Sequence, residues 1–178
     1  MKPERQLEYD RTYLRMAKVL SELSYANRNK VGALIVSEKG QIIAQGWNGT
    51  PSGMDNCCED ILCNCKWIHG CRKNGEPIEK ILKFKNAVEF CKDCDFAKLT
   101  TKPEVLHAES NAISKCAKWL SSTENATLYV TLSPCNECAK LIIQAGIKRV
   151  VFAEKYRDES GIDLLIKNNI IVDYINNI

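Results

Sequence analysis

The chain has 178 residues, of which 45% are hydrophobic and 26% charged, values that are ordinary for a globular domain and exclude a collagen-like or wholly disordered chain. Its 25 Lys and Arg residues nearly balance 22 Asp and Glu, so the net charge is only +3. We expect no nucleic-acid partner, because a duplex-binding module shows a dense basic face. The sequence shows neither a membrane-length apolar stretch nor a signal-peptide pattern. We therefore expect a single domain over residues 1–178, no membrane partner, and a location in the cytoplasm, or in the host cytoplasm if the source is viral.

The first part of the chain predicts a helix followed by a β-hairpin. Apolar residues recur near the helical period within residues 4–24, and Pro3 suits the start of a helix. Residues 31–36 and 41–46 are short β-prone runs separated by a Ser-Glu-Lys-Gly turn, which is typical of a hairpin.

A large insertion is expected after the hairpin, at about residues 57–103. The periodicity fades there, and Gly and Pro residues recur. Because so long a structureless loop is improbable in a compact domain, we expect either a helix near residues 78–90 or another tie such as a metal.

Strands and helices alternate after residue 103. We expect a helix that begins at His107 and has one apolar stripe: Ala108, Ala112, Cys116 and Trp119. The following elements are expected at residues 127–131 (strand), 134–145 (helix), 148–153 (strand), 158–167 (helix) and 170–174 (strand). Ser133 is the expected N-cap of the helix at 134–145, and Gly146 its expected end. Such alternation implies parallel strands with right-handed crossovers, so we predict an α/β fold of three layers, α/β/α, on a mixed five-stranded sheet.

Two helix starts carry residues that suit a catalytic zinc site. His107 and Glu109 open one predicted helix, and Cys135 and Cys138 open another, where their spacing places both thiols on one face. A helix N-terminus favours the thiolate that zinc requires. One His and two Cys leave a fourth tetrahedral position for water, whose pKa zinc lowers towards ~7 and whose proton a carboxylate can move. The alternative is a His on a core-facing turn with two buried thiols.

Three segments carry a family resemblance. They are residues 107–113 (HAESNAI), residues 128–140 (LYVTLSPCNECAK) and residues 46–51 (GWNGTP). The His-x-Glu and Pro-Cys-x-x-Cys motifs are those of zinc-dependent base and nucleotide deaminases. On these residues the chain resembles the deoxycytidylate (dCMP) deaminases of the cytidine deaminase superfamily, although that family usually has Tyr at Trp47. The resemblance implies a cytidine deaminase-like fold.

The resemblance also implies the roles of the site residues. It makes His107, Cys135 and Cys138 the ligands of a catalytic Zn²⁺. Glu109 becomes the catalytic proton carrier in the hydrolysis of dCMP to dUMP and ammonia, which supplies dUMP for thymidylate synthesis. The implied substrate-binding residues are Asn48, Ser24, Arg28 and Tyr156. A turn residue, a solvated charge and a rim tyrosine are the alternatives for Asn48, Arg28 and Tyr156.

Regulation is a further implication of the resemblance. Many members of the family are hexamers that dCTP activates and dTTP inhibits, and Mg²⁺ would accompany such triphosphates. We expect the effector near the corner formed by Gly49, Thr50, Pro51 and Gly53. The alternative is that this corner only turns the chain and shapes the substrate pocket.

Seven of the ten cysteines fall within residues 57–94. In a reducing compartment clustered cysteines favour metal over disulfides, and Cys91 and Cys94 have the spacing of structural zinc sites. Some relatives hold a second zinc near the Asn-Cys-Cys segment. Cys57, Cys91 and Cys94 are therefore the candidate ligands of a second zinc. Cys63, Cys65 and Cys71 are rival ligands, and a flexible loop with reduced thiols is the alternative.

Two other functions compete with a nucleotide deaminase. A polynucleotide deaminase, acting on tRNA adenosine or single-stranded cytosine, needs a basic path and aromatic platforms, whereas this chain has a charge of +3 and 7% aromatic residues. A zinc-ribbon interaction module has no need of Glu109 beside a ligand.

Overall fold

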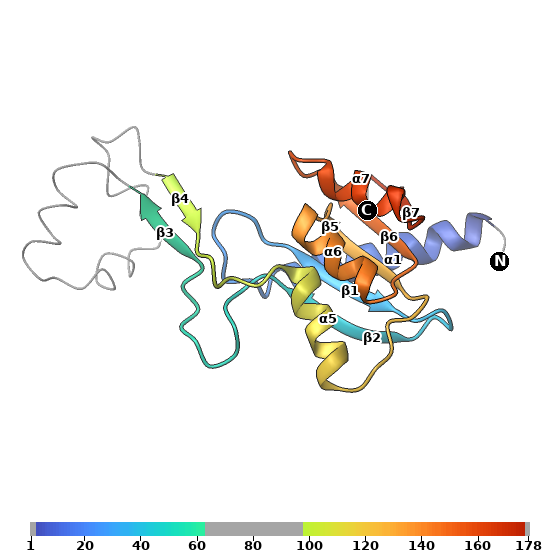
Figure 1. Ribbon diagram of the computed structural model, residues 1–178, viewed down its shortest axis with the longest axis horizontal. Coiled ribbons are helices and arrows are strands. Elements are labelled where there is room, and N and C mark those ends of the chain that lie inside the picture. Colours follow the sequence, from blue (N-terminus) through green and yellow to red (C-terminus); the bar gives the residue numbers. More distant parts are fainter. Residues whose placement is uncertain (1–2, 63–97, 177–178) are drawn as a thin grey trace, which may run out of the picture. The chain divides into compact units, whose positions relative to one another are not determined.

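The computed structural model in Figure 1 describes residues 3–62 and 98–176. The chain forms two compact units, one made of residues up to 57 and from 104 onward, the other of residues 58–103. In the smaller unit, strands β3 (Glu59–Leu62) and β4 (Lys98–Thr101) pair antiparallel. The helix expected near residues 78–90 lies outside the described residues. That the chain is one domain with an insertion stays a prediction.

The larger unit is built on the expected five-stranded mixed sheet. Its strands are β1 (Gly32–Val36), β2 (Ile42–Trp47), β5 (Thr127–Leu132), β6 (Arg149–Glu154) and β7 (Ile171–Tyr174). Their order across the sheet is β2-β1-β5-β6-β7. Strand β1 is antiparallel to both of its neighbours, and β5, β6 and β7 are mutually parallel. The hairpin and the parallel crossovers are both confirmed.

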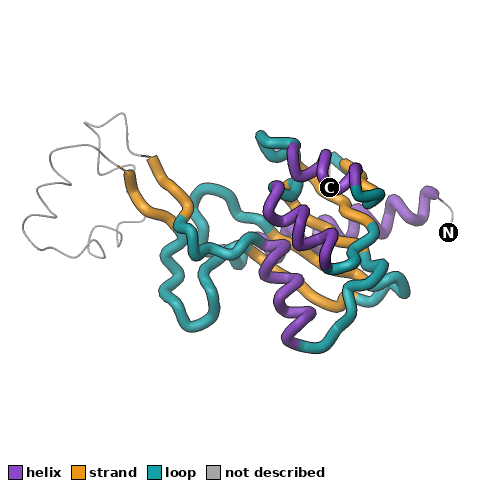
Figure 2. The backbone as a smooth tube through the Cα atoms, in the orientation of Figure 1, coloured by secondary structure: helices purple, strands orange, loops and turns teal. Residues whose placement is uncertain are grey.

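Helices cover both faces of this sheet, as Figure 2 shows. Helix α1 (Pro3–Ser21) lies on one face, and α5 (Ala108–Lys118), α6 (Asn136–Gln144) and α7 (Ser160–Lys167) lie on the other. Successive residues of a strand point to opposite faces. Accordingly, Ala33 and Ile35 of β1 join the core beneath α5–α7, whereas Leu34 and Val36 join the core beneath α1. The predicted three-layer α/β/α architecture is thus confirmed.

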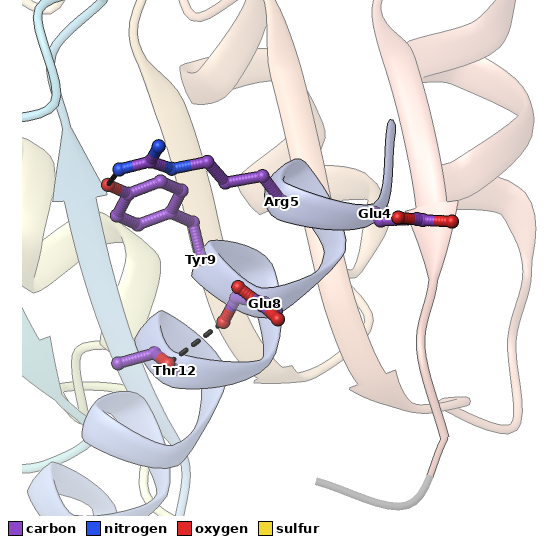
Figure 3. A pocket seen from close by; sticks show the side chains of 5 residues that line it. All are labelled: Glu4, Arg5, Glu8, Tyr9 and Thr12. Atoms are coloured by element: carbon purple, nitrogen blue, oxygen red, sulfur yellow. Dashed lines mark hydrogen bonds between the residues drawn. The ribbon is translucent and has the colours of Figure 1, made fainter. Parts of the chain in front are cut away.

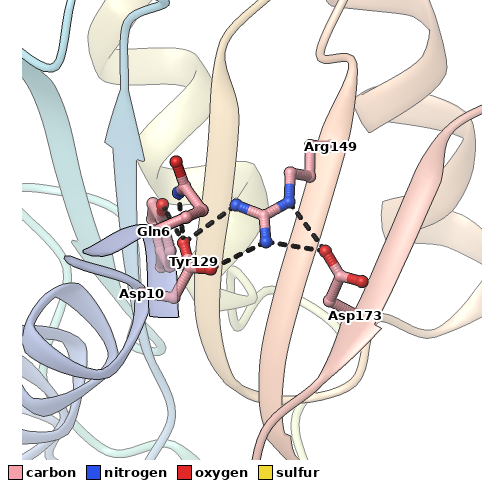
Figure 4. A network of polar contacts seen from close by, with 5 residues as sticks. All are labelled: Gln6, Asp10, Tyr129, Arg149 and Asp173. Carbon is pink, nitrogen blue, oxygen red and sulfur yellow. Dashed lines mark hydrogen bonds and ion pairs between the residues drawn. The ribbon is translucent and has the colours of Figure 1, made fainter. Parts of the chain in front are cut away.

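A buried polar network also ties α1 to the sheet (Figure 4). The Asp10 carboxylate accepts hydrogen bonds from both terminal nitrogens of Arg149 at 2.8 Å, from the Tyr129 hydroxyl at 2.7 Å and from Gln6 at 2.9 Å. Arg149 also pairs with Asp173 at 2.7 Å.

Among the described residues, no helix is long and apolar enough to cross a membrane.

Three local expectations were wrong. The first helix ends at Ser21, three residues before the expected end at residue 24. Trp119 follows the end of α5 and is 70% exposed, because the chain turns at Leu120, where φ is 55°. Ser133 does not cap α6, whose N-cap is Cys135, because the Ser133 hydroxyl bonds to another loop. Gly146, with φ of 73°, follows the end of α6 as expected.

Candidate active site

The functional residues gather at one edge of the sheet. Strands β2, β5 and β6 run in the same direction, since β1 is antiparallel to both of its neighbours and β5 is parallel to β6. Their carboxyl ends therefore meet at the same edge, which is where open α/β sheets hold their ligands. Helix α6 starts immediately beyond β5 at this edge, so that its first turn faces the site.

Three side chains at this edge converge on a point that suits a metal ion. The Nδ1 atom of His107 lies 3.4 Å from the Sγ atoms of both Cys135 and Cys138, and the three ligand atoms lie within 4.8 Å of one another. With Zn–N about 2.0 Å and Zn–S about 2.3 Å, tetrahedral ligands are roughly 3.5 Å apart. A single ring nitrogen has one proton or one lone pair, so it cannot make a full hydrogen bond to each sulfur, whereas a shared cation would contact all three ligand atoms.

The Cys135 sulfur is poised to bind a cation. Hydrogen bonds from Cys138 and His107 lower the pKa of the Cys135 thiol to about 3, and Cys135 is also the N-cap of α6. The hydrogen bond to Cys135, together with burial, raises the pKa of Cys138. The hydrogen bond with Cys135 raises the pKa of His107. Cys138 is buried, Cys135 half-buried and His107 exposed, which leaves one side of the site open to a ligand.

Glu109 lies in the first turn of α5, two residues after His107. The glutamate is 4% exposed, and burial raises the pKa of its carboxyl group. A raised pKa brings a carboxyl group closer to the range in which it can both accept and return a proton near neutral pH. The structure therefore places a buried carboxyl group beside the converging ligands.

Asn48, a predicted substrate-binding residue, makes two side-chain hydrogen bonds to the loop before β1. Its Oδ1 accepts a hydrogen bond from the backbone N–H of Val31, and its Nδ2 donates to the Asn29 carbonyl, both at 2.8 Å. Ser24 is 3% exposed, and its hydroxyl donates to the Asn48 carbonyl at 2.8 Å. Arg28 belongs to the same loop. The structure thus joins these predicted residues at the site's edge, and their contact with substrate stays a prediction.

The segment after Asn48 lies directly against the residues that lead into α5. Gly49 and Leu106 exchange two backbone hydrogen bonds, at 3.1 and 2.9 Å. Gly49 is thus paired with the residue that immediately precedes His107. Thr50 donates from its hydroxyl to the Asn56 side chain at 3.4 Å, and Gly53 has φ of 90°. The predicted effector corner therefore adjoins the metal site, and its role stays a prediction.

Sequence reasoning missed two contacts of the cysteine-bearing turn, one of which involves Tyr156. Its backbone N–H donates to the Ser133 hydroxyl at 2.7 Å, two residues before Cys135. Gly161 of α7 packs so closely on Pro134 that an added Cβ would overlap the Pro134 carbonyl and the Cys135 backbone. No local pattern marked Gly161, and Ser133 was expected only as a helix cap, because both contacts join segments that only the fold brings together.

Of the three candidate ligands of a second zinc, the structure describes only Cys57. Cys57 is half-buried, whereas Cys91 and Cys94 lie outside the described residues, together with the rivals Cys63, Cys65 and Cys71. In the described ranges, His107, Cys135 and Cys138 are the one group of three or more potential ligands close enough to share a metal.

A shallow hollow also lies along α1 (Figure 3), on the sheet face opposite α5 and α6. The residues that line it are Glu4, Arg5, Glu8, Tyr9 and Thr12. All of them come from one helix, and the drawn hydrogen bonds stay within that helix. We assign this hollow no function.

Hydrolytic deamination of a base requires a metal to activate water and a carboxyl group to move its proton. A three-layer α/β/α fold that presents both at one sheet edge defines the class of protein as a zinc-dependent deaminase. The model of the cytidine and deoxycytidylate deaminase zinc-binding region matches residues 7–154, and the chain belongs to this family.

Individual relatives agree with this assignment. The deoxycytidylate deaminase of Enterobacteria phage T4 is 36% identical over 167 residues, covering 88% of this chain and 84% of the relative. The human deoxycytidylate deaminase is 37% identical over 154 residues, covering 85% and 68%. The crystal structure of dCMP deaminase from the cyanophage S-TIM5 in complex with dCMP and dUMP superposes with a TM-score of 0.70 at 36% identity, covering 98% of this chain and 99% of that one.

Proposed function

We propose that this protein hydrolyses dCMP to dUMP and ammonia. The observation that carries the proposal is the convergence of His107, Cys135 and Cys138 beside the buried carboxyl group of Glu109. The choice of dCMP is supported by the relatives named deoxycytidylate deaminase and by the S-TIM5 enzyme solved with dCMP and dUMP.

The metal ligands and Glu109 have different roles in this hydrolysis. His107, Cys135 and Cys138 would hold a zinc ion, which when bound would lower the pKa of a water to about 7 and so supply the nucleophile. Glu109 would move both protons of this water: the first to N3 of the cytosine ring as the C4–O bond forms, and the second, from the new C4 hydroxyl, to the departing amine. The C4–O bond forms and the C4–N4 bond breaks, so one water replaces one ammonia with no oxidant or reductant.

Replacement of Glu109 by Gln tests the proposal. Gln keeps the shape of the side chain but cannot carry the proton, so the rate of ammonia release from dCMP should fall by roughly 10² or more while zinc stays bound. The matched control is Glu137→Gln, because Glu137 is an exposed glutamate in the first turn of α6 that pairs with Lys140. The control should retain wild-type turnover.

Three results would contradict the assignment. Near-normal turnover in E109Q would remove Glu109 from the mechanism. Full zinc occupancy of the site after Cys135→Ser or His107→Ala would show that the ligand set is wrong. Ammonia release from a tRNA or single-stranded DNA oligomer, but not from dCMP, would favour a polynucleotide deaminase instead.

The proposal extends to regulation and supply. We infer that the enzyme supplies dUMP for thymidylate synthesis in the cytoplasm, or in the host cytoplasm if the source is viral, as a hexamer that dCTP activates and dTTP inhibits, with Mg²⁺ on the triphosphates. The position of the corner at Gly49–Gly53 next to the metal site supports this inference. The measurement is dCMP saturation with and without each effector. Hyperbolic curves that neither nucleotide changes, from a protein that sediments as a monomer, would refute both the regulation and the hexamer.

A second, structural zinc is also proposed. The spacing of Cys91 and Cys94 and the position of Cys57 at the start of the cysteine-rich segment support it. Metal analysis should find more than one zinc per chain, and C91S should lose the excess while part of the dCMP turnover remains. A single zinc, with the thiols of this segment all titratable in the native protein, would favour the loop of reduced cysteines.

A further inference from the structure

Helix α5 is fastened to the outer strand of the sheet by side chains that reach backbone carbonyls. Asn111 Nδ2 donates to the Trp47 carbonyl at 2.8 Å, and Lys115 Nζ donates to the Gln45 carbonyl at 3.0 Å. The two donors are four residues apart on the helix, and the two carbonyls are two residues apart on the strand. Both spacings keep the groups on one side of their element, so the helix and the strand are matched in register.

The accepting carbonyls point away from the sheet. Strand β2 is an edge strand, and the backbone N–H of Asn48, the residue after it, donates toward β1 at the Val31 carbonyl. Because backbone groups alternate along a strand, the carbonyls of Gln45 and Trp47 point outward. An outward carbonyl on an edge strand has no partner in its own sheet, so these two depend on α5.

Asn111 occupies the position between the metal site and the substrate loop. Its backbone N–H donates to the His107 carbonyl at 2.9 Å, which places it one turn after the metal ligand. The carbonyl that its side chain holds belongs to Trp47, the residue immediately before Asn48. One side chain therefore connects the helix turn that carries His107 and Glu109 with the loop that carries Asn48.

The distance between α5 and β2 is closely fixed. Gly46 packs against α5 so closely that an added Cβ would overlap the Ala108 carbonyl and the backbone nitrogen of Ala112. Backbone contact at Gly46 sets the distance between the helix and the strand, and the directional bond from Asn111 sets how far one can slide along the other.

We propose that Asn111 is a positioning residue for the deaminase reaction, which holds the nucleotide loop beginning at Asn48 in register with His107 and Glu109. This inference rests on the proposed function, because it assigns that loop to the substrate. Cys135 and Cys138 lie at the start of α6, and His107 lies at the start of α5 on the same helix turn as Glu109, so loss of the Asn111 side-chain bond leaves the metal ligands in place and displaces the nucleotide from the proton carrier. A displacement of about 1 Å is enough to cost up to 10²-fold in rate.

Asn111→Ala and Asn111→Asp test the role of the donor. Asp keeps the volume of Asn but presents an acceptor to the Trp47 carbonyl, so both variants should lower kcat/KM for dCMP by ten- to one hundred-fold. Asn111→Gln keeps an amide donor and should recover part of the loss. Zinc content and the Co²⁺–thiolate absorption of the cobalt-substituted enzyme should match wild type in all three variants.

The matched control is Lys115→Met, which removes the neighbouring hydrogen bond from α5 to the same strand and keeps the length of the side chain. A merely structural clamp predicts that N111A and K115M lose stability alike and keep wild-type kcat/KM. Positioning predicts that the kinetic loss is confined to the Asn111 variants.

Amide hydrogen exchange provides a readout that is independent of activity. The Gly49 N–H bonds to the Leu106 carbonyl, so its protection reports whether the loop stays docked. Exchange over residues 48–50 should accelerate in N111A and N111D and stay at the wild-type rate in K115M. Wild-type kcat/KM and exchange in folded N111D would overturn the inference. If the wild-type protein did not deaminate dCMP, the proposed function would fail, and the exchange experiment would still test the clamp.

Discussion

Replacement of Asp10 by Asn should separate the scaffold from the active site. Asp10 is 2% exposed and accepts four hydrogen bonds, two of them from Arg149. Asn keeps one acceptor oxygen but loses the charge, and its amide group faces a guanidinium nitrogen. Removing one partner of a buried pair costs about 3–5 kcal/mol. Because the Arg149 side chain is 18% exposed and keeps Asp173, we expect the lower end, about 3 kcal/mol.

This loss is measurable as a change in unfolding. For a domain of this length, 1 kcal/mol shifts the Tm by about 2–4 °C, so D10N should melt roughly 6–12 °C lower, with a matching fall in the urea midpoint. The kcat for dCMP at 25 °C should be unchanged, since the network lies beneath α1 on the face opposite the zinc-site helices. The control is Asp173→Asn, whose more exposed carboxylate (40%) should contribute less than about 1 kcal/mol.

The effect should depend on pH in a defined direction. Burial by itself would raise the pKa of Asp10, but the hydrogen bonds from Arg149, Tyr129 and Gln6 outweigh it and hold the pKa below its ordinary value. A lowered pKa stabilises the folded state above the unfolded-state pKa of about 3.9, and this stabilisation is lost as the pH falls through the folded-state pKa. The difference between wild type and D10N should thus be constant from pH 7 to about 5 and shrink below about pH 4. A D10N protein within about 1 kcal/mol of wild type at pH 7, or with kcat reduced at 25 °C, would refute the reasoning.

Three further outcomes are expected. A zinc chelator such as dipicolinic acid should abolish ammonia release from dCMP and expose the thiols of Cys135 and Cys138 to titration, and added Zn²⁺ should reverse both changes; activity that survives complete zinc removal would contradict a metal-dependent reaction. Gly161→Ala should weaken zinc binding by roughly ten-fold or more in a folded protein, because the new Cβ must displace the Cys135 backbone; an unchanged zinc affinity in a competition titration would show that α7 does not support the ligand. Leu120→Asn should raise the free energy of unfolding by up to about 1 kcal/mol, since Leu120 is 94% exposed with φ of 55° and Asn tolerates this conformation better. A lower Tm of this variant at pH 7 would show that the leucine side chain makes a stabilising contact.

Local patterns were sufficient for the regular elements and for the chemistry. The apolar runs at residues 127–131 and 148–153 predicted β5 and β6 to within a residue, because both strands are buried on both faces and need apolar side chains throughout. The residues that converge as a metal site were also predictable, since zinc needs specific donor atoms and a helix start favours a thiolate. Helix ends were less predictable: Trp119 fits the periodicity of α5 but lies beyond its last turn.

The sequence by itself therefore determined the layers, the hairpin, and the His, Glu and Cys residues that converge at the candidate site. Tertiary structure alone decided how these residues are held. Trp47 and Asn111 are 64 positions apart and Asp10 and Arg149 are 139 apart, and Ser133 and Gly161 reach their partners across separate loops. Such contacts leave no local periodicity, because a hydrogen bond or a close backbone approach between distant segments depends on strand order and helix placement, which are set by the packing of the whole domain.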